Sequence, residues 1–382
     1  FRYNQCKSAL ICVYQWLFFG GVRQSVTIKG LSRVERLRRL MERQGIEAMV
    51  VTKRENCLYL SGFTGTDGLV LVTGDRVYLV TDRRYTEQAT VECRGWEVVE
   101  AESDYLRVIG ELARGLGRVG FESRHLTYDQ YLRLRKEIGD RLQPQSGLVE
   151  ELRKVKDESE IAYIAEAIRI GDWAFENLIA NIGPGWAERD IAWEMVRLLR
   201  RGGCTKEAFD IIAVSGRRAS LPHGQPTDNR IEPGDMLTLD FGGFYSGYAG
   251  DTTRTVAIET VSNRLREVYY RVLEAQVAAI ETVRAGVACR EVDRAARSYL
   301  EKYGLGPHFV HSTGHGLGLE VHEEPAVSSK SEEILAENMV VTIEPGVYIP
   351  GWGGVRIEDV VIVKETGCEV LTKAEKELLI IQ

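Results

Sequence analysis

The sequence contains no C-x-x-C pair, although it has seven cysteines among its 382 residues. The cysteines are scattered and odd in number: Cys6, Cys12, Cys57, Cys93, Cys204, Cys289 and Cys368. Secreted disulfide scaffolds instead show even numbers of cysteines at regular spacings. The pattern therefore argues against a disulfide framework and predicts a reducing compartment, the cytoplasm.

Clusters of basic residues and long apolar runs are also missing. The formal net charge is −7, so we expect no nucleic-acid partner. The apolar run at residues 9–22 is too short for a membrane span, and no A-x-A-like cleavage site follows it. We therefore expect residues 1–29 to be either an upstream extension or an added strand or helix that packs on the body, rather than a working signal. We expect no membrane partner.

The length favours two domains, because a chain of 382 residues exceeds the size of one ordinary core. Strand-like and helical stretches alternate along the first part of the chain. The strand-like runs are at 48–52, 96–100 and 118–122, a hairpin is at 68–82, and the helical stretches are at 105–116 and 128–138. This alternation predicts an α/β domain over residues 30–147. The Gln-Pro-Gln-Ser-Gly stretch at 143–147 is its predicted boundary.

Residues 148–382 read as two similar halves. Helices are predicted at 156–182 and 187–203 before the first hairpin, and at 263–286 and 290–304 before the second. The sequence Thr238–Gly242 (TLDFG) aligns with Thr342–Gly346 (TIEPG), and each is followed by a turn rich in Gly and Tyr. The pattern predicts an α+β domain with a mostly antiparallel sheet, whose halves face each other across one site.

Four carboxylates stand at the ends of strand-like runs in this domain: Asp240, Asp251, Glu344 and Glu358. Burying them is costly unless they are paired or bind a cation. Because converging carboxylates repel each other, the pattern predicts more than one divalent metal ion. His315, in the glycine-rich STGHGLG, would add one imidazole. Such an oxygen-rich site suits Mn or another hard-to-borderline divalent ion.

Three further histidines lie in loops near these acids. His223 and His322 stand among Gly and Pro residues, which favours proton transfer or substrate contact over a structural role. His311 either contacts substrate or orients its loop. Arg356 lies two residues before Glu358, so on a strand the two would face the same side. Arg356 would bind a substrate carbonyl or carboxylate, or merely offset the acidic cluster.

Four motifs carry a family resemblance: SGRRASLPHG, LDFGGFYSGYAGDTTRT, HSTGHGLGLEVHEEP and TIEPGVYIPGWGGVRIEDVVIV. Together they resemble those of the Xaa-Pro peptidases, aminopeptidase P and prolidase, which have the pita-bread metallopeptidase fold. The resemblance covers nearly the whole chain from about residue 29. It implies a creatinase-like N-terminal α/β domain at 30–147 and a pita-bread catalytic domain at 148–382.

The resemblance also implies site roles and partners. Two metal ions would be bound by Asp240, Asp251, His315, Glu344 and Glu358. Substrate and protons would be handled by His223, His322 and Arg356. Manganese is the expected metal, with cobalt or zinc as alternatives, and a homodimer is expected.

The predicted activity is hydrolysis of the peptide bond before proline in short peptides, with Glu344 accepting the proton of the attacking water. The first candidate is an Xaa-Pro aminopeptidase and the alternative is an Xaa-Pro dipeptidase, or prolidase. Arg356 would serve either a peptide carbonyl or a dipeptide carboxylate, so the two stay open.

Three other interpretations rank lower. Methionine aminopeptidase shares the five ligands but lacks an α/β domain like residues 30–147. Creatinase has both domains but is similar without the metal ligands. A binding module that has lost catalysis would have lost ligands or histidines, whereas this chain keeps all of them.

Overall fold

The computed structural model describes residues 33–382. The apolar run at 9–22 and the predicted extension at 1–29 lie outside the described residues. The chain divides into two compact units after Arg153. The predicted boundary at 147 lies earlier, at a turn where Gly147 adopts a φ of 70°.

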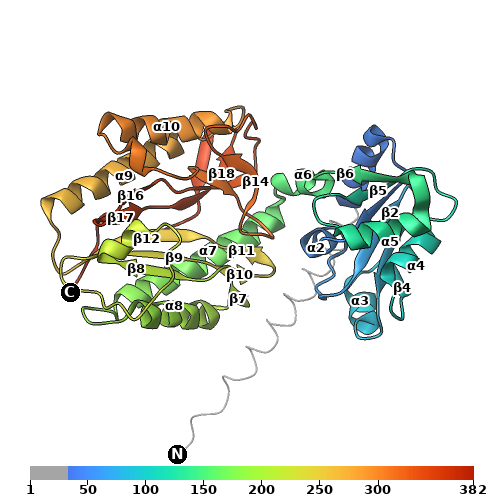
Figure 1. Ribbon diagram of the computed structural model, residues 1–382, viewed down its shortest axis with the longest axis horizontal. Helices are drawn as coiled ribbons and strands as arrows, with labels where there is room; N and C mark the ends of the chain where they lie inside the picture. Colours follow the sequence, from blue (N-terminus) through green and yellow to red (C-terminus); the bar gives the residue numbers. More distant parts are fainter. Residues whose placement is uncertain (1–32) are drawn as a thin grey trace, which may run out of the picture. The chain divides into compact units, whose positions relative to one another are not determined.

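The first unit is built on a six-stranded sheet with the order β4-β3-β2-β1-β5-β6 (Figure 1). Its strands are β1 (Ala48–Val51), β2 (Leu69–Thr73), β3 (Val77–Thr81), β4 (Glu97–Glu100), β5 (Val119–Glu122) and β6 (Leu142–Gln145). Strand β2 runs antiparallel to β1 and β3. Parallel pairing joins β4 to β3, β5 to β1 and β6 to β5. This is the α/β layer that the sequence predicts.

The helices of the first unit cover 33–44, α2 (Arg54–Ser61), α3 (Thr86–Glu92), α4 (Tyr105–Leu112), α5 (Tyr128–Ile138) and α6 (Leu148–Lys154). The short α2, α3 and α6 were not predicted. The predicted boundary at 143–147 overlaps β6, because Pro144 is tolerated in a strand at the edge of a sheet. Leu152 of α6 accepts a hydrogen bond from the Tyr59 hydroxyl at 3.0 Å, which holds α6 to this unit.

The first half of the second unit combines α7 (Glu158–Ile179) and α8 (Glu188–Gly202) with a sheet ordered β20-β12-β9-β8. Its strands are β8 (Ile212–Ser215), β9 (Met236–Phe241), β12 (Thr252–Ile258) and β20 (Ile380–Ile381). A smaller sheet holds β7 (Lys206–Glu207), β10 (Gly243–Tyr245) and β11 (Tyr248–Ala249). Helix α7 begins at a capping box between Asp157 and Glu160.

The second half repeats this arrangement with α9 (Asn263–Thr282), α10 (Cys289–Lys302) and a sheet ordered β14-β13-β15-β18-β19. Its strands are β13 (Gly314–Gly316), β14 (Glu323–Val327), β15 (Val340–Ile343), β18 (Asp359–Lys364) and β19 (Gly367–Val370). The hairpin of β16 (Gly346–Ile349) and β17 (Gly353–Arg356) stands apart. The unit therefore has several separate sheets rather than one. They are antiparallel apart from the β12–β20 pair.

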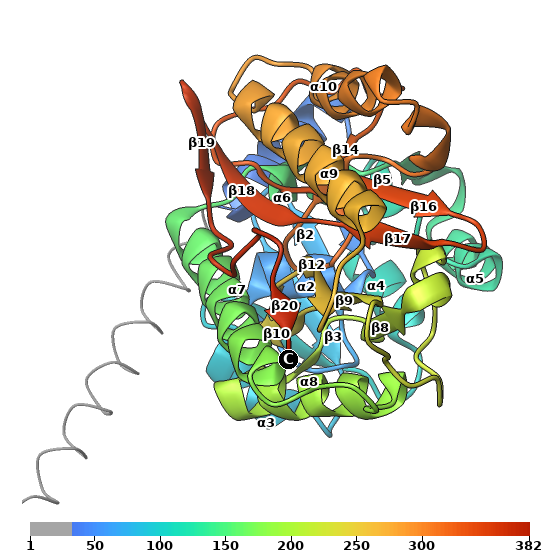
Figure 2. The same cartoon turned by 90° about the vertical axis from the view of Figure 1, so that its left-hand side faces the viewer.

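Each half has its own apolar core. Helices α7 and α8 pack against Leu237, Leu239 and Phe241 of β9. Helices α9 and α10 pack in a second cluster with Val341 of β15 and Val361 of β18. Figure 2 shows α9 beside β17 and β18, while α8 lies by β8 and β9. Among the helices of residues 33–382, none is long and apolar enough to cross a bilayer.

Buried polar contacts join the two halves. The Glu358 N–H donates to the Thr253 carbonyl at 3.1 Å. Arg254 of β12 forms an ion pair with Asp359 of β18 at 2.9 Å, and each side chain is only 1% exposed. Arg254 also donates to the Glu358 carbonyl. Since a buried ion pair is costly to break, this contact fixes the strand that follows Glu358.

We predict that Arg254→Leu lowers the free energy of unfolding by about 3 kcal/mol. It removes the fully buried partner of Asp359, which keeps only Lys376 as an ionic partner, and it removes the donor to the Glu358 carbonyl. Chemical denaturation measures the loss. Arg197→Leu is the matched control, since it breaks an exposed ion pair with Glu194 and should cost about 0.5 kcal/mol or less. Equal costs for the two variants would contradict a structural role for the buried pair.

Candidate metal centre

Asp240 and Asp251 come to one face of the first half through the pairing of β9 with β12. Asp240 lies opposite Thr253, and Phe241 lies opposite Thr252. Because side chains alternate along a strand, Asp251 faces the same side as Thr253 and therefore the same side as Asp240. The chain between the two aspartates folds back through β10 and β11.

Glu344 and Glu358 come together in the same way in the second half. Strands β15 and β18 are antiparallel, with Ile343 opposite Asp359. Glu344 follows the last residue of β15, and Glu358 precedes the first residue of β18. The two glutamates are therefore neighbours just beyond the paired ends, while the β16–β17 hairpin connects them along the chain.

His315 lies in the short strand β13, between β14 and β15. Gly314 beside it has no room for a side chain, since a Cβ would lie 1.9 Å from the Thr342 carbonyl oxygen. The His315 Nδ1 lies 3.0 Å from the Gly316 carbonyl oxygen, which makes Nδ1 the donor. Nε2 then faces the acids, at 3.2 Å from Glu344 Oε1 and 3.7 Å from Asp251 Oδ2. This orientation suits a ligand that binds through Nε2.

Three of the carboxylates meet most closely. Asp240, Asp251 and Glu358 each offer an oxygen, and these oxygens lie within 4.8 Å of one another. Among the described residues, Asp240 Oδ1 and Glu358 Oε1 are buried without any hydrogen-bond partner. Buried oxygens are normally satisfied, so two unpartnered ones in the same acidic cluster fit a bound cation.

Electrostatics supports the same conclusion. Burial raises the pKa of Asp251 and of Glu358 well above their usual range, and the neighbouring negative charges raise both further. For Glu344, burial is outweighed by the hydrogen bond and charge of His315, which lower its pKa to about 2. Burial alone would lower the pKa of the His315 imidazole. The hydrogen bond and negative charge of Glu344 outweigh burial and raise this pKa to about 9. Divalent cations would offset the excess negative charge.

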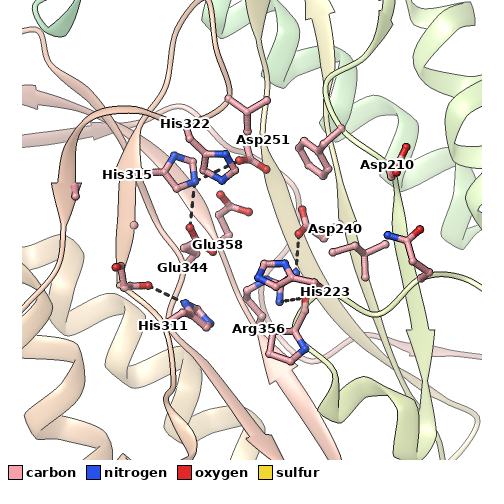
Figure 3. Close-up of a pocket in the computed structure, with 18 residues that line it drawn as sticks. Asp210, His223, Asp240, Asp251, His311, His315, His322, Glu344, Arg356 and Glu358 are labelled. Atoms are coloured by element: carbon pink, nitrogen blue, oxygen red, sulfur yellow. Dashed lines mark hydrogen bonds and ion pairs between the residues drawn. The ribbon is translucent and has the colours of Figure 1, made fainter. Parts of the chain in front are cut away.

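All the predicted site residues line one cavity of about 450 Å³ (Figure 3). The predicted ligands are Asp240, Asp251, His315, Glu344 and Glu358, and the other predicted residues are His223, His311, His322 and Arg356. Figure 3 shows them converging from strands and loops of both halves. The structure thus brings the whole predicted set together.

The three additional histidines differ in their contacts. The His322 ring lies 4.4 Å from the His315 ring, measured between centroids, and is exposed to the cavity. His223 is also exposed and follows Pro222. His311 is held at both nitrogens, by the Ser312 carbonyl at 2.8 Å and the Tyr348 hydroxyl at 2.9 Å. His223 and His322 are therefore available to a substrate, whereas His311 is fixed in place.

Arg356 directs its donors to protein groups. Nη2 donates to Asp240 Oδ2 at 2.6 Å, and Nη1 donates to the Tyr348 hydroxyl at 2.7 Å and to the Pro222 carbonyl at 3.2 Å. Nε donates to Thr253 Oγ1 at 3.1 Å. Arg356 therefore holds Asp240 and the start of the His223 loop in position.

Sequence reasoning missed several residues of this site. Tyr348 links Arg356 to His311, and its place four residues after Glu344 in EPGVYI was the available signal. Phe209 and Asp210 line the cavity from the segment before β8. No motif marks these two, because only the pairing of β8 with β9 brings them near Asp240.

Comparison with known proteins agrees with this geometry. The model of metallopeptidase family M24 matches residues 162–365, and that of the creatinase/prolidase N-terminal domain matches residues 33–155. The chain belongs to metallopeptidase family M24. This M24 peptidase is 38% identical to the Xaa-Pro dipeptidase of Pyrococcus furiosus, over 91% of this chain and 99% of that protein.

Solved structures are similar over the same range. The Xaa-Pro dipeptidase from Bacillus anthracis superposes with a TM-score of 0.90 at 43% identity, over 92% of this chain and 99% of that chain. The X-Pro aminopeptidase from Thermotoga maritima gives a TM-score of 0.84 at 38% identity, over 89% of this chain and 99% of that chain. The predicted fold class and the predicted membership of the Xaa-Pro peptidase family are confirmed, and the protein is a metallopeptidase.

We predict that Glu358→Gln stabilises the metal-free protein, and that the gain grows from about pH 5 to about pH 8. The folded protein keeps protons on acids whose pKa is raised, whereas the unfolded chain releases them above about pH 4. The free energy of unfolding of the unaltered metal-free protein therefore falls as pH rises. A glutamine at position 358 has no proton to release and avoids this loss. Thermal unfolding in a chelator measures it, and each 1 kcal/mol shifts Tm by about 2–4 °C.

The exposed Glu337→Gln is the control for this prediction and should leave Tm unchanged across the same pH range. If the rise in Tm caused by Glu358→Gln did not depend on pH, ionisation of the buried Glu358 would not be the source of the stability loss at high pH. Adding Mn²⁺ should reverse the ranking, because the variant loses a ligand that the unaltered protein retains.

Proposed function

We propose that this M24 peptidase hydrolyses the peptide bond between an N-terminal residue and proline in short peptides, using divalent metal ions. The observation that carries the proposal is the buried acidic cluster, with its two unpartnered oxygens, beside exposed histidines in one cavity. The choice of bond is supported by the names of similar proteins, which include an Xaa-Pro dipeptidase and an X-Pro aminopeptidase.

The residues that would hold the ions are Asp240, Asp251, His315, Glu344 and Glu358. We propose two ions, with manganese first and cobalt or zinc as alternatives, since carboxylates with one imidazole suit such metals. When bound, the ions supply Lewis-acid polarisation of the scissile carbonyl and lower the pKa of the attacking water. Asp251 and Glu358 would each offer the ions a carboxylate with two oxygens, close to the oxygens of Asp240.

Glu344 is the proposed proton acceptor. Its low pKa keeps it ionised at neutral pH, and it sits at the cavity wall within 3.2 Å of His315. An ionised carboxylate at this place can take a proton from water and deliver it to the proline nitrogen as the bond breaks. His322, beside His315 and exposed to the cavity, is placed to donate a hydrogen bond to the oxygen that becomes negative.

Selection of proline would depend on shape. An X–Pro amide has no N–H, so a site cannot recognise it through that donor. The cavity offers apolar side chains instead, including Phe209, Ile212 and Val321. A pocket with apolar walls and a few polar groups suits the compact, rigid proline ring.

The two forms of the activity differ in whether the substrate ends at proline or continues beyond it. The dipeptidase is favoured by the 43% identical Bacillus anthracis structure and the 38% identical Pyrococcus furiosus protein, both named Xaa-Pro dipeptidase. The aminopeptidase, the first candidate from sequence, is favoured by the Thermotoga maritima structure. Arg356 already donates to Asp240, Tyr348 and Pro222, so we propose that it positions these groups rather than binding the substrate carboxylate.

We further propose a cytoplasmic homodimer. The dimer rests on the family resemblance, and the compartment rests on the scattered cysteines. Size-exclusion chromatography with light scattering would measure the assembly directly.

Glu344→Gln should abolish turnover, because glutamine cannot accept the proton. We expect kcat to fall by about 1,000-fold or more while the fold is retained, since the residue keeps its shape. Steady-state kinetics on an X–Pro substrate, with circular dichroism as the folding check, measures both. A variant that kept most of the rate would remove Glu344 as the proton acceptor.

Metal dependence and substrate class are tested in one assay. Chelated protein should be inactive, and added Mn²⁺ should restore hydrolysis of an Xaa-Pro dipeptide, an Xaa-Pro-Yaa tripeptide, or both. Cleavage of the dipeptide alone identifies a dipeptidase, whereas cleavage of the tripeptide identifies an aminopeptidase. Metal binding without cleavage of either peptide would leave the metal centre in place and refute the proposed substrate.

A further inference from the structure

Each half has one buried carboxylate outside the cavity on the second helix of its helix pair, at the first residue of α8 and at the fifth residue of α10. Glu188 lies at the start of α8 and Asp293 lies in α10, and both side chains are fully buried. Neither is among the residues that line the cavity. A buried carboxylate is costly unless it is hydrogen-bonded, so the partners of these two residues reveal what they hold.

Glu188 holds both ends of the loop that carries His223. It accepts hydrogen bonds from the Ser215 N–H at 2.9 Å, and from the Thr227 N–H at 3.1 Å and hydroxyl at 3.0 Å. Arg218 donates to Glu188 at 3.0 Å and to the Gln225 carbonyl at 2.6 Å. Both ends of the His223 loop are thus fixed to one helix.

Asp293 holds the loop that carries His311 with the same kinds of contact. It accepts from the Thr313 N–H at 3.2 Å and from the Thr313 hydroxyl at 2.9 Å. Arg297 donates two hydrogen bonds of 2.9 Å to Asp293, and donates to the Phe309 and His311 carbonyls at 3.0 Å each. The loop is therefore fixed to α10 on both sides of His311.

The two arrangements share four parts. Each has a buried acid on the second helix of a pair and an arginine that pairs with it. Each also has a threonine that donates through both N–H and hydroxyl, and a loop carbonyl that accepts from the arginine. The residues before the two helices match as well, since Ala187 and Ala288 each form an isolated β-bridge, to Arg230 and Ile334. Figure 3 shows the two loop histidines, His223 and His311, at the cavity.

We propose that Glu188 and Asp293 are a matched pair of positioning residues, each of which fixes one histidine-bearing loop over the metal centre. The inference rests on the proposed function for the role of the histidines. A fully satisfied buried network is rigid, and losing one member leaves several donors unpaired, so the loop would shift. Displacements of about 1 Å at a catalytic group can cost about 100-fold in rate.

The two residues should act differently, because their loops have different neighbours. The Glu188 loop carries His223 and contains no predicted metal ligand. It reaches one only indirectly, through Arg356, which donates to the Pro222 carbonyl and to Asp240. The Asp293 loop connects to ligands, since the Thr313 carbonyl accepts from the Glu344 N–H at 2.7 Å and Thr313 stands two residues before His315. We therefore infer that Glu188 affects turnover alone, whereas Asp293 affects turnover and metal affinity.

The experiment compares Glu188→Gln and Asp293→Asn in the full chain, with Mn²⁺ affinity measured by calorimetry and kcat and KM measured on X–Pro peptides. Asp293→Asn should weaken Mn²⁺ binding about 10- to 100-fold, as is usual for residues that support ligands. Glu188→Gln should leave Mn²⁺ affinity within about twofold while kcat/KM falls at least about tenfold.

The matched control is Glu122→Gln. Glu122 is a buried glutamate of the first unit that accepts from the Thr52 and Lys53 N–H groups at 2.6 and 2.8 Å. The Glu122→Gln variant should have a lower Tm but an unchanged Mn²⁺ affinity and an unchanged kcat/KM. If Glu188→Gln and Asp293→Asn changed only Tm, as this control does, the positioning role would be wrong.

A milder pair of variants keeps the test decisive if the acid variants do not fold. Thr227→Ser and Thr313→Ser retain both donors and should keep the activity, whereas Thr227→Val and Thr313→Val lose the hydroxyl and should lose activity. Only Thr313→Val should also weaken Mn²⁺ binding. Equal activity of Ser and Val variants would overturn the proposal.

Failure of the proposed function gives a distinct result. If the unaltered protein binds Mn²⁺ but cleaves no X–Pro peptide, the substrate proposal fails. The difference in Mn²⁺ affinity between Asp293→Asn and Glu188→Gln then still tests the inference, and equal affinities would refute it.

Discussion

Repulsion between buried carboxylates is the constraint on which the rest of the second unit depends. Asp240, Asp251 and Glu358 bring their oxygens within 4.8 Å of one another, where burial already opposes ionisation. Such a cluster is stable only if rigid backbone holds it and cations offset its charge. The paired strands supply the first condition, since each acid stands at the end of a strand whose pairing sets its direction. The family's metal chemistry supplies the second.

The fold keeps support and chemistry in separate layers. Strands and strand ends present the acids and His315, and loops present the other three histidines. The helices α8 and α10 carry Glu188 and Asp293. Polar contacts between the halves, such as Arg254 with Asp359, bring the two sets of predicted ligands to one place. This separation lets the cavity stay open to peptides while the residues behind it are closely packed.

Much of the site was predictable from sequence because its chemistry is local. Asp240 and Glu344 each end a strand-like run and are followed within two residues by glycine. Asp251 and Glu358 each open a strand-like run, so all four acids stand out without any structure. Supporting residues gave no such signal. Glu188 and Asp293 resemble ordinary acids near the start of a helix, and only tertiary contacts distinguish them. Helices α5 and α7 were predicted to within three residues at each end, and the structure shows that each begins at a capping box. The division of the second unit into several sheets was missed, since pairing between distant strands leaves no local trace.

The link between the halves has a consequence for synthesis. A chain made from its N-terminus presents Asp240 and Asp251 long before the ribosome reaches Glu358, whose carbonyl Arg254 contacts across 104 positions. Until then the first two acids have neither the remaining ligands nor the strands that hold them. The proposed metal centre is therefore completed late in synthesis, because a nascent chain with only its first half translated lacks three of the five predicted ligands, His315, Glu344 and Glu358.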